Sequence, residues 1–349
     1  MNRVYSAIGA LCLMAAAVVT PVAAHGLHAR AAHKPFTIGI VLDVGGVNDK
    51  SFNHLAYVGL QRAEATYSYV KGTYISTQEQ SQYVPNITHY AGKVNLVIAT
   101  GALMSQAIYQ VARQYPHQHF AIIDGAPADA NFVTHNLPNV ENLLFHEQES
   151  GFLAGIVAGL MEKNHVGKAK HNVIGYMGGL PVPAVVRYEA GYIAGARKVD
   201  PSIRVCGGYS QSFTDQTKGN AIGRTQISKG ADILFAVAGA SGLGYLAAAQ
   251  QEGRYGIGVD ADQGYLGKYV ITSAIKRVDK AVLQAVTATL HGKFRGGNHF
   301  YTIHNGGTGI GRISPIVPKY IGRIAQTYEK KMKAGKIHPA TKIPSNTGC

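Results

Sequence analysis

Short, continuously apolar segments recur along this chain, and each is separated from the next by a longer segment with helical periodicity. Strands of this kind are typical of sheets that helices cover on both faces, because neither face of the strand meets water. The alternation therefore predicts an α/β fold with mostly parallel sheets. We expect strands at 36–42, 69–76, 94–100, 119–123, 171–177, 203–209, 232–237, 255–259 and 269–274, and helices at 50–66, 103–115, 147–163, 184–198, 214–229, 242–252 and 277–291.

The first strand–loop–helix unit carries the most chemical information. Its strand, 36–42, ends at Asp43, and the chain then crosses a Gly-Gly turn and passes Asn48 and Phe52 as it enters a helix. Ligands of parallel α/β sheets bind at this carboxyl end of the strands. Neither Gly-Lys-Ser/Thr nor Gly-x-Gly-x-x-Gly follows the strand, so the loop lacks the usual phosphate-binding residues. A carboxylate, an amide and an aromatic ring suit a neutral polar ring compound better.

Several later strands also end in a small or acidic residue, in most cases followed by glycine. The pattern occurs at Thr100-Gly101, Asp124-Gly125, Gly178-Gly179, Ala238-Gly239 and Asp260. Small residues at a strand end let a ligand approach the backbone closely. One such pair usually just makes a turn, but their recurrence at one edge of the predicted sheets indicates a binding site there.

Residues 1–24 have the features of a secretory signal peptide. Arg3 gives the positive start, Ile8–Val19 is apolar, and Val22–Ala24 offers a small-residue cleavage site. The apolar run is shorter than the ~20 residues that a membrane-spanning helix needs, and no later segment approaches that length. No lipid-bearing cysteine follows the cleavage site, because Cys12 lies inside the apolar run. We therefore expect a periplasmic protein whose residues 25–35 form a flexible leader.

The chain is strongly basic. It has 33 Lys and Arg against 19 Asp and Glu, and loss of the signal peptide removes only Arg3, which leaves 32 − 19 = +13. The basic residues are scattered, apart from clusters at 163–170 and 330–333 that look like solvated helix ends, so we expect no nucleic-acid partner. Cleavage leaves Cys206 and Cys349, which an oxidising compartment allows to pair, although sequence gives no distance between them.

The sequence contains no recognisable catalytic or metal-binding arrangement. Ser241 does not lie in a Gly-x-Ser-x-Gly turn, because position 243 is Leu. Glu147 and Glu149 are two positions apart and therefore point to different faces of a helix, which does not make an acid–base pair. None of the 15 histidines has the His-x-x-x-His or His-Glu-x-x-His spacing of a zinc site. We predict a protein that is not an enzyme and that holds no cofactor or metal.

The length of the mature chain, about 310 residues, is too great for one ordinary core and suits two lobes. Two α/β lobes that close on a ligand make a clam-shell receptor. Such a site needs aromatic rings that stack on an apolar face and carboxylates that accept hydrogen bonds from hydroxyl groups. Phe52 and Phe213 lie in polar loops and are candidates for the rings. Either ring could instead pack its own helix onto the sheet.

Ordered motifs span nearly the whole mature chain. They are Asp43 with Val47–Asn53, Phe120–Gly125, Glu149–Gly155, Gly175–Gly179, Ser212–Asp215, Ala238–Gly244, Gly258–Gln263 and Thr272–Asp279. With these motifs the chain resembles, over roughly residues 36 to 330, the basic membrane protein (Bmp) family of ABC-transporter substrate-binding proteins, in particular its purine nucleoside receptor-like group. The resemblance implies a type I periplasmic binding fold, with two lobes that each contain a mostly parallel sheet flanked by helices. It also implies delivery of a purine nucleoside to an ABC permease in the inner membrane.

The resemblance also assigns roles to individual residues. Phe52 and Phe213 would stack on the purine. Asp43 and Asn48 would line the base side, and Asp124 would also face the cleft. Asp260, chosen over Asp262 by motif alignment, and Lys276 would hold the ribose hydroxyls, and Gly239 belongs to the same predicted site.

Two features depart from the family pattern: the lipid-anchoring cysteine is missing, and Val44 and Val47 line a loop that is often more polar. The ligand could therefore also be a free nucleobase, in which case Asp260 and Lys276 would contact no sugar. A ligand-sensing regulatory protein without a permease is the alternative from another class. We expect a monomer, since a closing clam shell needs no second copy.

The predicted boundaries follow from the strand ends. We expect residues 36–125 plus about 261–274 in lobe 1, residues 126–260 plus about 275–335 in lobe 2, and a flexible tail at 336–349. The chain would cross between the lobes near 124–126, near 260 and near 273.

Overall fold

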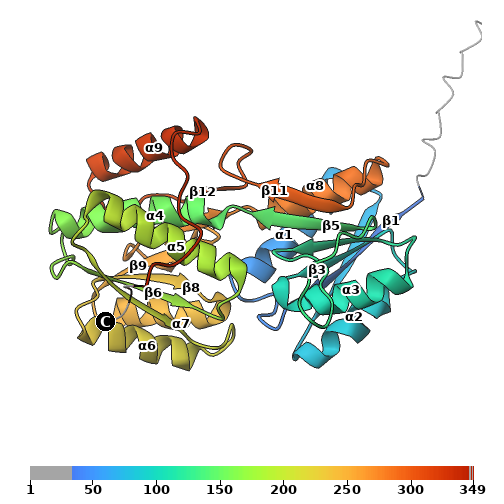
Figure 1. Ribbon diagram of the computed structural model, residues 1–349, viewed down its shortest axis with the longest axis horizontal. Coiled ribbons are helices and arrows are strands. Elements are labelled where there is room, and N and C mark those ends of the chain that lie inside the picture. Colours follow the sequence, from blue (N-terminus) through green and yellow to red (C-terminus); the bar gives the residue numbers. More distant parts are fainter. Residues whose placement is uncertain (1–33, 346, 348) are drawn as a thin grey trace, which may run out of the picture. The chain divides into compact units, whose positions relative to one another are not determined.

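Two six-stranded sheets form the framework of the chain from Pro35 to Cys349 (Figure 1). The computed structural model describes residues 34–345, 347 and 349. The first sheet contains, in spatial order, β11 (Gly297–Tyr301), β5 (Val140–Phe145), β4 (His119–Ile123), β3 (Leu96–Thr100), β1 (Phe36–Leu42) and β2 (Val70–Ser76), all paired in parallel.

The second sheet has the same number of strands. Its spatial order is β12 (Thr308–Ile310), β10 (Val270–Lys276), β9 (Tyr255–Asp260), β8 (Ile233–Val237), β6 (Val173–Gly178) and β7 (Arg204–Tyr209). Only the short β12 is antiparallel to its neighbour, β10. The predicted α/β class with two mostly parallel sheets is confirmed. We call the first sheet with its helices the first lobe and the second sheet with its helices the second lobe.

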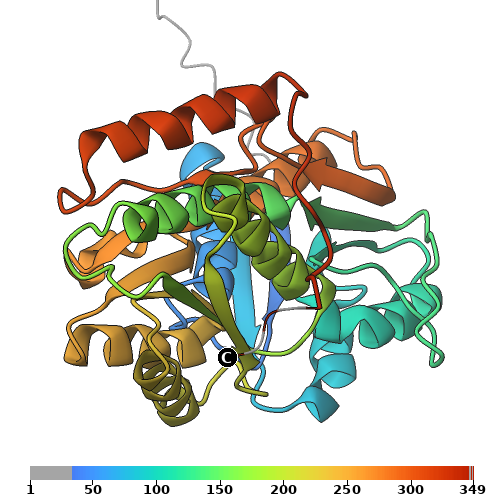
Figure 2. The same ribbon diagram turned by 60° about the vertical axis from the view of Figure 1, so that its left-hand side comes forward.

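Helices cover both faces of each sheet (Figures 1 and 2). In the first lobe α1 (Phe52–Thr66) and α8 (Val278–Leu290) pack on one face, and α2 (Tyr83–Tyr90) and α3 (Ser105–Gln114) pack on the other. In the second lobe α4 (Glu147–Lys163), α5 (Pro183–Val199) and α9 (Lys319–Lys333) lie on one face, and α6 (Gln216–Ser228) and α7 (Gly239–Gln251) on the other.

This two-sided covering explains why the strands read as continuous apolar runs. Side chains alternate between the faces of a strand, so Ile40 belongs to the core beneath α1 and α8 while its neighbour Val41 belongs to the core beneath α2 and α3. Both residues are fully buried.

Helix α4 packs against α5 at very short range, because glycines of each helix face the backbone of the other. A Cβ on Gly155 would lie 2.1 Å from the carbonyl oxygen of Tyr192, and one on Gly191 would lie 2.2 Å from that of Gln148. Only glycine permits this approach, which fixes the position of Glu147 at the start of α4.

The chain passes between the lobes three times, after β5 at His146, after β10 at Arg277, and between β11 and β12 at residues 302–307. The crossings predicted near 124–126, 260 and 273 are therefore misplaced. Strand β5 was not recognised because its polar residues Glu141 and Asn142 interrupt the apolar run, yet both are buried.

The prediction that residues 261–274 belong to lobe 1 is also wrong, because residues 270–274 are part of β10 in the second sheet. The short helix η3 (Gln263–Leu266) turns the chain back into the second sheet, where β10 pairs with β9. The Gln263 N–H donates to Ser273 Oγ at 3.0 Å and holds this turn. Strands β11 and β12 and helices α2 and α9 were also not predicted.

The described residues of the C-terminal segment are anchored to the second lobe. After α9 it runs across the second lobe to the C-terminus (Figures 1 and 2), with Ile337 and Ile343 packed on the core. Gly207 in β7 donates a backbone hydrogen bond to Thr347, and a disulfide joins Cys206 to Cys349. The predicted flexible tail at 336–349 is therefore corrected, whereas the signal peptide and residues 25–33 of the leader lie outside the described residues.

Among residues 34–345, 347 and 349, no helix has the length and apolar character required to cross a membrane.

Replacing Cys349 with Ser should lower the free energy of unfolding by about 2–4 kcal/mol, because the disulfide closes a long loop in the unfolded chain. The two cysteines are 143 positions apart. Urea denaturation measures the change. A reducing agent should lower the midpoint of the unmodified protein but leave that of the variant unchanged. Equal midpoints for both proteins without reductant would contradict a stabilising role of the disulfide.

Candidate functional site

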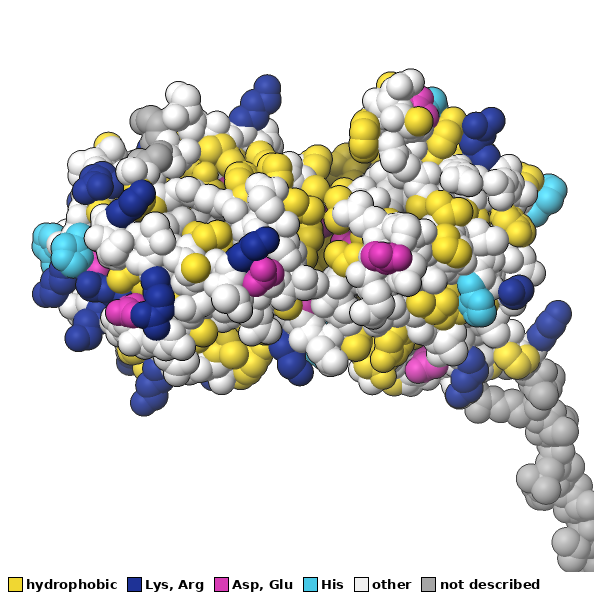
Figure 3. All heavy atoms as spheres, turned by 90° about the horizontal axis from the view of Figure 1, so that it is seen from below, with side chains coloured by type: hydrophobic (Ala, Val, Ile, Leu, Met, Phe, Trp, Pro, Cys, Tyr) yellow, Lys and Arg dark blue, Asp and Glu magenta, His cyan; other side chains and the backbone are white. Residues whose placement is uncertain are grey.

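The carboxyl ends of the central strands in both sheets face one cavity between the lobes. From the first lobe, Asp43, Phe52, Gly101 and Asp124 line it, and from the second lobe Tyr188, Phe213, Gly239, Asp260 and Lys276 do so. The space not filled by atoms is about 650 Å³, including its opening to solvent. The space-filling view shows a groove between the two halves, with apolar side chains along its walls (Figure 3).

The structure brings seven of the eight predicted site residues to this cavity. They are Asp43, Phe52, Asp124, Phe213, Gly239, Asp260 and Lys276. The exception is Asn48, which is exposed and does not line the cavity, whereas its neighbour Asp49 is buried and does.

Asp49 faces inward because it caps α1. Its Oδ1 accepts hydrogen bonds from the N–H groups of Ser51 and His54 at 2.9 and 3.0 Å, and its Oδ2 accepts from that of Asn53 at 2.8 Å. A carboxylate at a helix N-terminus satisfies N–H groups that have no partner within the helix and interacts favourably with the helix dipole. The polar loop before α1 thus has a structural role at Asp49.

The backbone of Asp43 is fixed at the end of β1. Its N–H donates to Asn53 Oδ1 at 2.9 Å and to Thr100 Oγ1 at 2.8 Å. The Thr100 hydroxyl in turn donates to Asn53 Oδ1 at 2.9 Å. The Oδ1 of Asp43 accepts hydrogen bonds from the Tyr83 hydroxyl and from the Val44 N–H. Burial raises the pKa of Asp43, although the hydrogen bond from Tyr83 opposes the shift.

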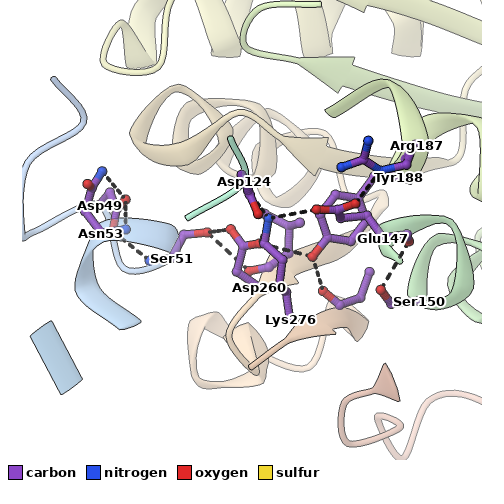
Figure 4. A network of polar contacts seen from close by, with 12 residues as sticks. Asp49, Ser51, Asn53, Asp124, Glu147, Ser150, Arg187, Tyr188, Asp260 and Lys276 are labelled. Carbon is purple, nitrogen blue, oxygen red and sulfur yellow. Dashed lines mark hydrogen bonds and ion pairs between the residues drawn. The ribbon is translucent and has the colours of Figure 1, made fainter. Parts of the chain in front are cut away.

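A network of buried charges includes three residues of the cavity lining, Asp124, Asp260 and Lys276 (Figure 4). Lys276 is 2% exposed, and its ammonium contacts Asp124 and lies 3.4 Å from Glu147 Oε1 and 3.8 Å from Asp260 Oδ1. Arg187 in α5 pairs with the other oxygen of Glu147 at 2.6 Å. Burial alone would lower the pKa of Lys276, but the three carboxylates raise it, so the ammonium stays charged.

Asp124 still has an unused acceptor. Its Oδ1 is buried and has no hydrogen-bond partner among the described residues, while Oδ2 contacts Lys276. Burial raises the pKa of Asp124 to about 6, and the nearby Lys276 ammonium limits the rise. An orphaned carboxylate oxygen on a cavity wall is a position where a ligand donor can bind.

Asp260 faces Asp124 from the end of β9. It accepts the Ser51 hydroxyl at 2.5 Å and the Tyr188 hydroxyl at 3.0 Å. Burial is the main cause that raises its pKa, with Lys276 acting in the opposite direction. Asp124 and Asp260 both have a φ of 61°, a left-handed conformation that is rare for residues other than glycine and is often found at functional sites.

The two phenylalanine rings come from opposite lobes and are both partly buried. The Lys276 ammonium lies 4.9 Å from the centre of the Phe52 ring. Phe213 packs over Gly179, where an added Cβ would lie 2.3 Å from the ring, and its carbonyl accepts the Ser241 N–H at 3.2 Å. Gly239, with a φ of 53°, opens α7 beside Phe213.

Sequence reasoning missed Tyr188 and Glu147. Tyr188 lies on α5 among apolar neighbours, and only the fold brings its hydroxyl to Asp260. Glu147 was considered only as an acid–base partner of Glu149, which instead binds the Ile303 N–H and the Thr308 hydroxyl. A signal for Glu147 existed, since a carboxylate that opens an otherwise apolar helix needs a partner.

Among the described residues no group of His, Cys, Asp and Glu is arranged to hold a metal ion. Two lobes around a cavity of carboxylates and aromatic rings are the architecture of a solute-binding protein. The family model of the Bmp ABC transporter substrate-binding proteins, PnrA-like, matches residues 36–346, and the chain belongs to this family of substrate-binding proteins, which are not enzymes.

Relatives of known sequence and structure agree with this assignment. The chain is 31% identical over 336 residues to the ABC transporter nucleoside-binding protein BmpA of Lactococcus lactis, covering 89% of this chain and 92% of the relative. It is 28% identical over 323 residues to an uncharacterized lipoprotein of Pyrococcus furiosus, covering 84% and 78%. A crystal structure of ABC transporter system solute-binding proteins from Aeropyrum pernix superposes with a TM-score of 0.79 at 25% identity and covers 89% of this chain and 95% of that one. The chain is therefore a solute-binding component of an ABC transporter.

Replacing Lys276 with Met should lower the free energy of unfolding of the ligand-free protein by about 3–5 kcal/mol, because it leaves buried carboxylates without their cation. Thermal and urea denaturation measure the loss. The matched control is Lys268→Met, because Lys268 is exposed just before β10 and should change stability by less than about 0.5 kcal/mol. Adding Asp124→Asn to Lys276→Met should restore part of the loss. Equal stability of the two lysine variants would show that the network does not need its ammonium.

Proposed function

We propose that this protein captures a purine nucleoside outside the cytoplasm by closure of its two lobes and passes it to an ABC permease in the inner membrane. The observation that carries the proposal is the pairing, in one cavity, of aromatic rings from opposite lobes with a row of buried carboxylates. A purine nucleoside has matching parts: a flat apolar base that stacks on rings, and a sugar whose hydroxyls donate hydrogen bonds.

The charge of the cavity wall supports a ligand without phosphate. Asp43, Asp49, Asp124 and Asp260 line the cavity, and Lys276 is the one cation among its lining residues. A phosphate would lie close to more negative than positive charges in a poorly hydrated space, which disfavours binding. Neutral donors such as sugar hydroxyls and ring N–H groups are attracted by the same carboxylates.

The residue roles that follow are specific. Phe52 and Phe213 stack on the base. Asp43 accepts a hydrogen bond from the polar edge of the base through Oδ2, the oxygen that Tyr83 does not contact. The unpartnered Oδ1 of Asp124 and the carboxylate of Asp260 accept hydroxyl hydrogen bonds from the sugar. Lys276 holds these carboxylates in their charged form. A nucleobase ligand would leave Asp124 and Asp260 without a contact to it.

Export to the periplasm is part of the proposal. It rests on the signal-peptide features of residues 1–24 and on the requirement that a substrate-binding component meet its solute before transport. The relative of Pyrococcus furiosus is an uncharacterized lipoprotein, whereas no cysteine lies directly after the predicted cleavage site of this chain.

The decisive experiment identifies the ligand that the purified protein carries. Denaturation should release it, and mass spectrometry should find a purine nucleoside. Calorimetric titration of the refolded protein should then give binding of guanosine, inosine or adenosine and much weaker binding of GMP. Tight binding of free guanine alone would favour the nucleobase alternative, and a solute without a purine would contradict the proposal.

Phe52→Ala and Phe213→Ala should each weaken nucleoside binding by about 1–3 kcal/mol, as for aromatic stacking on bases elsewhere. Leucine at either position should restore part of the apolar contact but little of the stacking. The control is Phe132→Ala, since Phe132 is 77% exposed and should leave affinity unchanged. If the two rings only fasten their helices to the sheets, the alanine variants will melt early and bind nucleoside normally.

A further inference from the structure

Hydrogen bonds join the two lobes directly beside the cavity. Ser51 Oγ donates to Asp260 Oδ2 at 2.5 Å and lies 3.3 Å from the carbonyl oxygen of Val259. Gln263 Nε2 donates to the carbonyl of Lys50 at 3.3 Å. Lys50 and Ser51 precede α1 in the first lobe, while the other residues belong to or follow β9 in the second. Ser51 and Gln263 are buried, yet neither lines the cavity.

The hydroxyl of Ser51 does not cap α1, although Ser51 directly precedes this helix. A serine that precedes a helix usually accepts a hydrogen bond from an N–H group of the first turn. Ser51 makes no such bond, because Asp49 already accepts from the N–H groups of Asn53 and His54. With α1 capped by Asp49, the partners of the Ser51 hydroxyl, Asp260 and Val259, both lie in the other lobe.

Each side of this contact is also fixed within its own lobe. Lys50 has a φ of 56° and Asp260 a φ of 61°, so each lobe presents its group from a left-handed backbone. Gln263 Oε1 accepts the Val259 N–H at 3.0 Å, which leaves its amino group to point at Lys50. Preorganised donors and acceptors form a contact between lobes with little further loss of side-chain freedom.

We propose that Ser51 and Gln263, with their partners Asp260 and Lys50, form an interlobe latch that stabilises the closed arrangement of the lobes and thereby sets ligand affinity. Ser51 and Gln263 are positioning residues, because they act through Asp260 and the turn before Phe52 and not through a contact with the ligand. The choice of nucleoside as ligand rests on the proposed function, but the latch itself does not, because it can close the lobes without a ligand.

The latch has a measurable consequence for binding. When the binding-competent closed form is a minor population, the apparent dissociation constant rises by the factor by which that population falls. Loss of one hydrogen bond to a buried carboxylate should lower the closed population by about tenfold. The ligand should then dissociate faster, since the closed form retains it.

The test compares Ser51→Ala with Ser51→Thr, which keeps the hydroxyl. The matched control is Ser150→Ala, because the hydroxyl of Ser150 is buried but bonds the carbonyl of Glu147 within its own helix. Calorimetry and stopped-flow release of guanosine give affinity and dissociation rate, and melting of the ligand-free protein reports stability. We expect about tenfold weaker binding for Ser51→Ala, near-normal binding for Ser51→Thr and Ser150→Ala, and a smaller loss for Gln263→Leu.

A second measurement needs no ligand. Spin labels on cysteines introduced at the exposed positions Gln110 in α3 and Thr225 in α6 report the distance between the lobes, because the native cysteines are bonded to each other. Ser51→Ala should reduce the short-distance population in the ligand-free protein, and Ser51→Thr should not.

The outcomes separate the latch from the proposed function. Failure of the unmodified protein to bind any nucleoside would defeat the proposed function, and the distance measurement would then decide the latch alone. If Ser51→Ala changes neither guanosine binding nor the distance distribution, the latch is wrong. If it lowers the melting temperature while binding and distances stay normal, Ser51 only stabilises the fold, which also overturns the latch.

Discussion

The ammonium of Lys276 is the group on which the arrangement of the two lobes depends. Lys276 is the last residue of β10, immediately before the crossing at Arg277. Glu147 is the first residue after the crossing at His146. The contact of Lys276 with Asp124 connects the second sheet to the end of β4 in the first. A buried charge is stable only when it is paired, so this one cation and its carboxylates fix where the lobes can meet.

The same network explains why strained residues persist at the cavity. Asp124 and Asp260 adopt left-handed backbone conformations that cost of order 1–3 kcal/mol each in residues other than glycine. Lys276 holds the carboxylate of Asp124, and the hydroxyls of Ser51 and Tyr188 hold that of Asp260, once the backbone has turned. The strain places both carboxylates at the carboxyl ends of their strands, where a ligand can reach them.

The fold was largely predictable because its signal is local. Strands 36–42 and 119–123 and helix 147–163 have the predicted bounds, since an apolar run covered on both faces or a periodic helix needs no tertiary information. Strand β5 was missed because Glu141 and Asn142 are polar but buried. Their polar groups find partners on β11, where Asn142 bonds Asn298 at 2.9 Å and Glu141 lies 3.4 Å from His299, and the local sequence does not contain these contacts.

The lining of the cavity was predictable where polar residues follow strand ends, as at Asp43, Asp124 and Asp260. It was not predictable where a loop chooses between two adjacent polar residues. Asn48 and Asp49 are equivalent in the sequence pattern. A charged carboxylate interacts more favourably with the N-terminus of α1 than a neutral amide does, so Asp49 turns inward and Asn48 stays exposed. The hydroxyls of Ser51 and Tyr188 belong to the site only through long-range contacts, which no local pattern reveals.

The placement of charge also explains why so basic a chain can enclose so acidic a site. Of the 19 acidic residues, 12 are buried, and the other 19 − 12 = 7 are partly or fully exposed. The buried ones are Asp43, Asp49, Asp124, Glu141, Glu147, Glu149, Glu162, Glu189, Asp200, Asp232, Asp260 and Asp279. Lys276 is the buried cation among the described Lys and Arg residues. Figure 3 shows the result on one face, where dark blue side chains are spread over the surface and few magenta ones appear. The basic character of the chain follows from its excess of Lys and Arg over Asp and Glu, and the burial of most carboxylates makes the surface more basic still. A positive exterior and a cavity lined by carboxylates also give the two regions opposite preferences: anions gather outside, while neutral molecules rich in hydrogen-bond donors are favoured within.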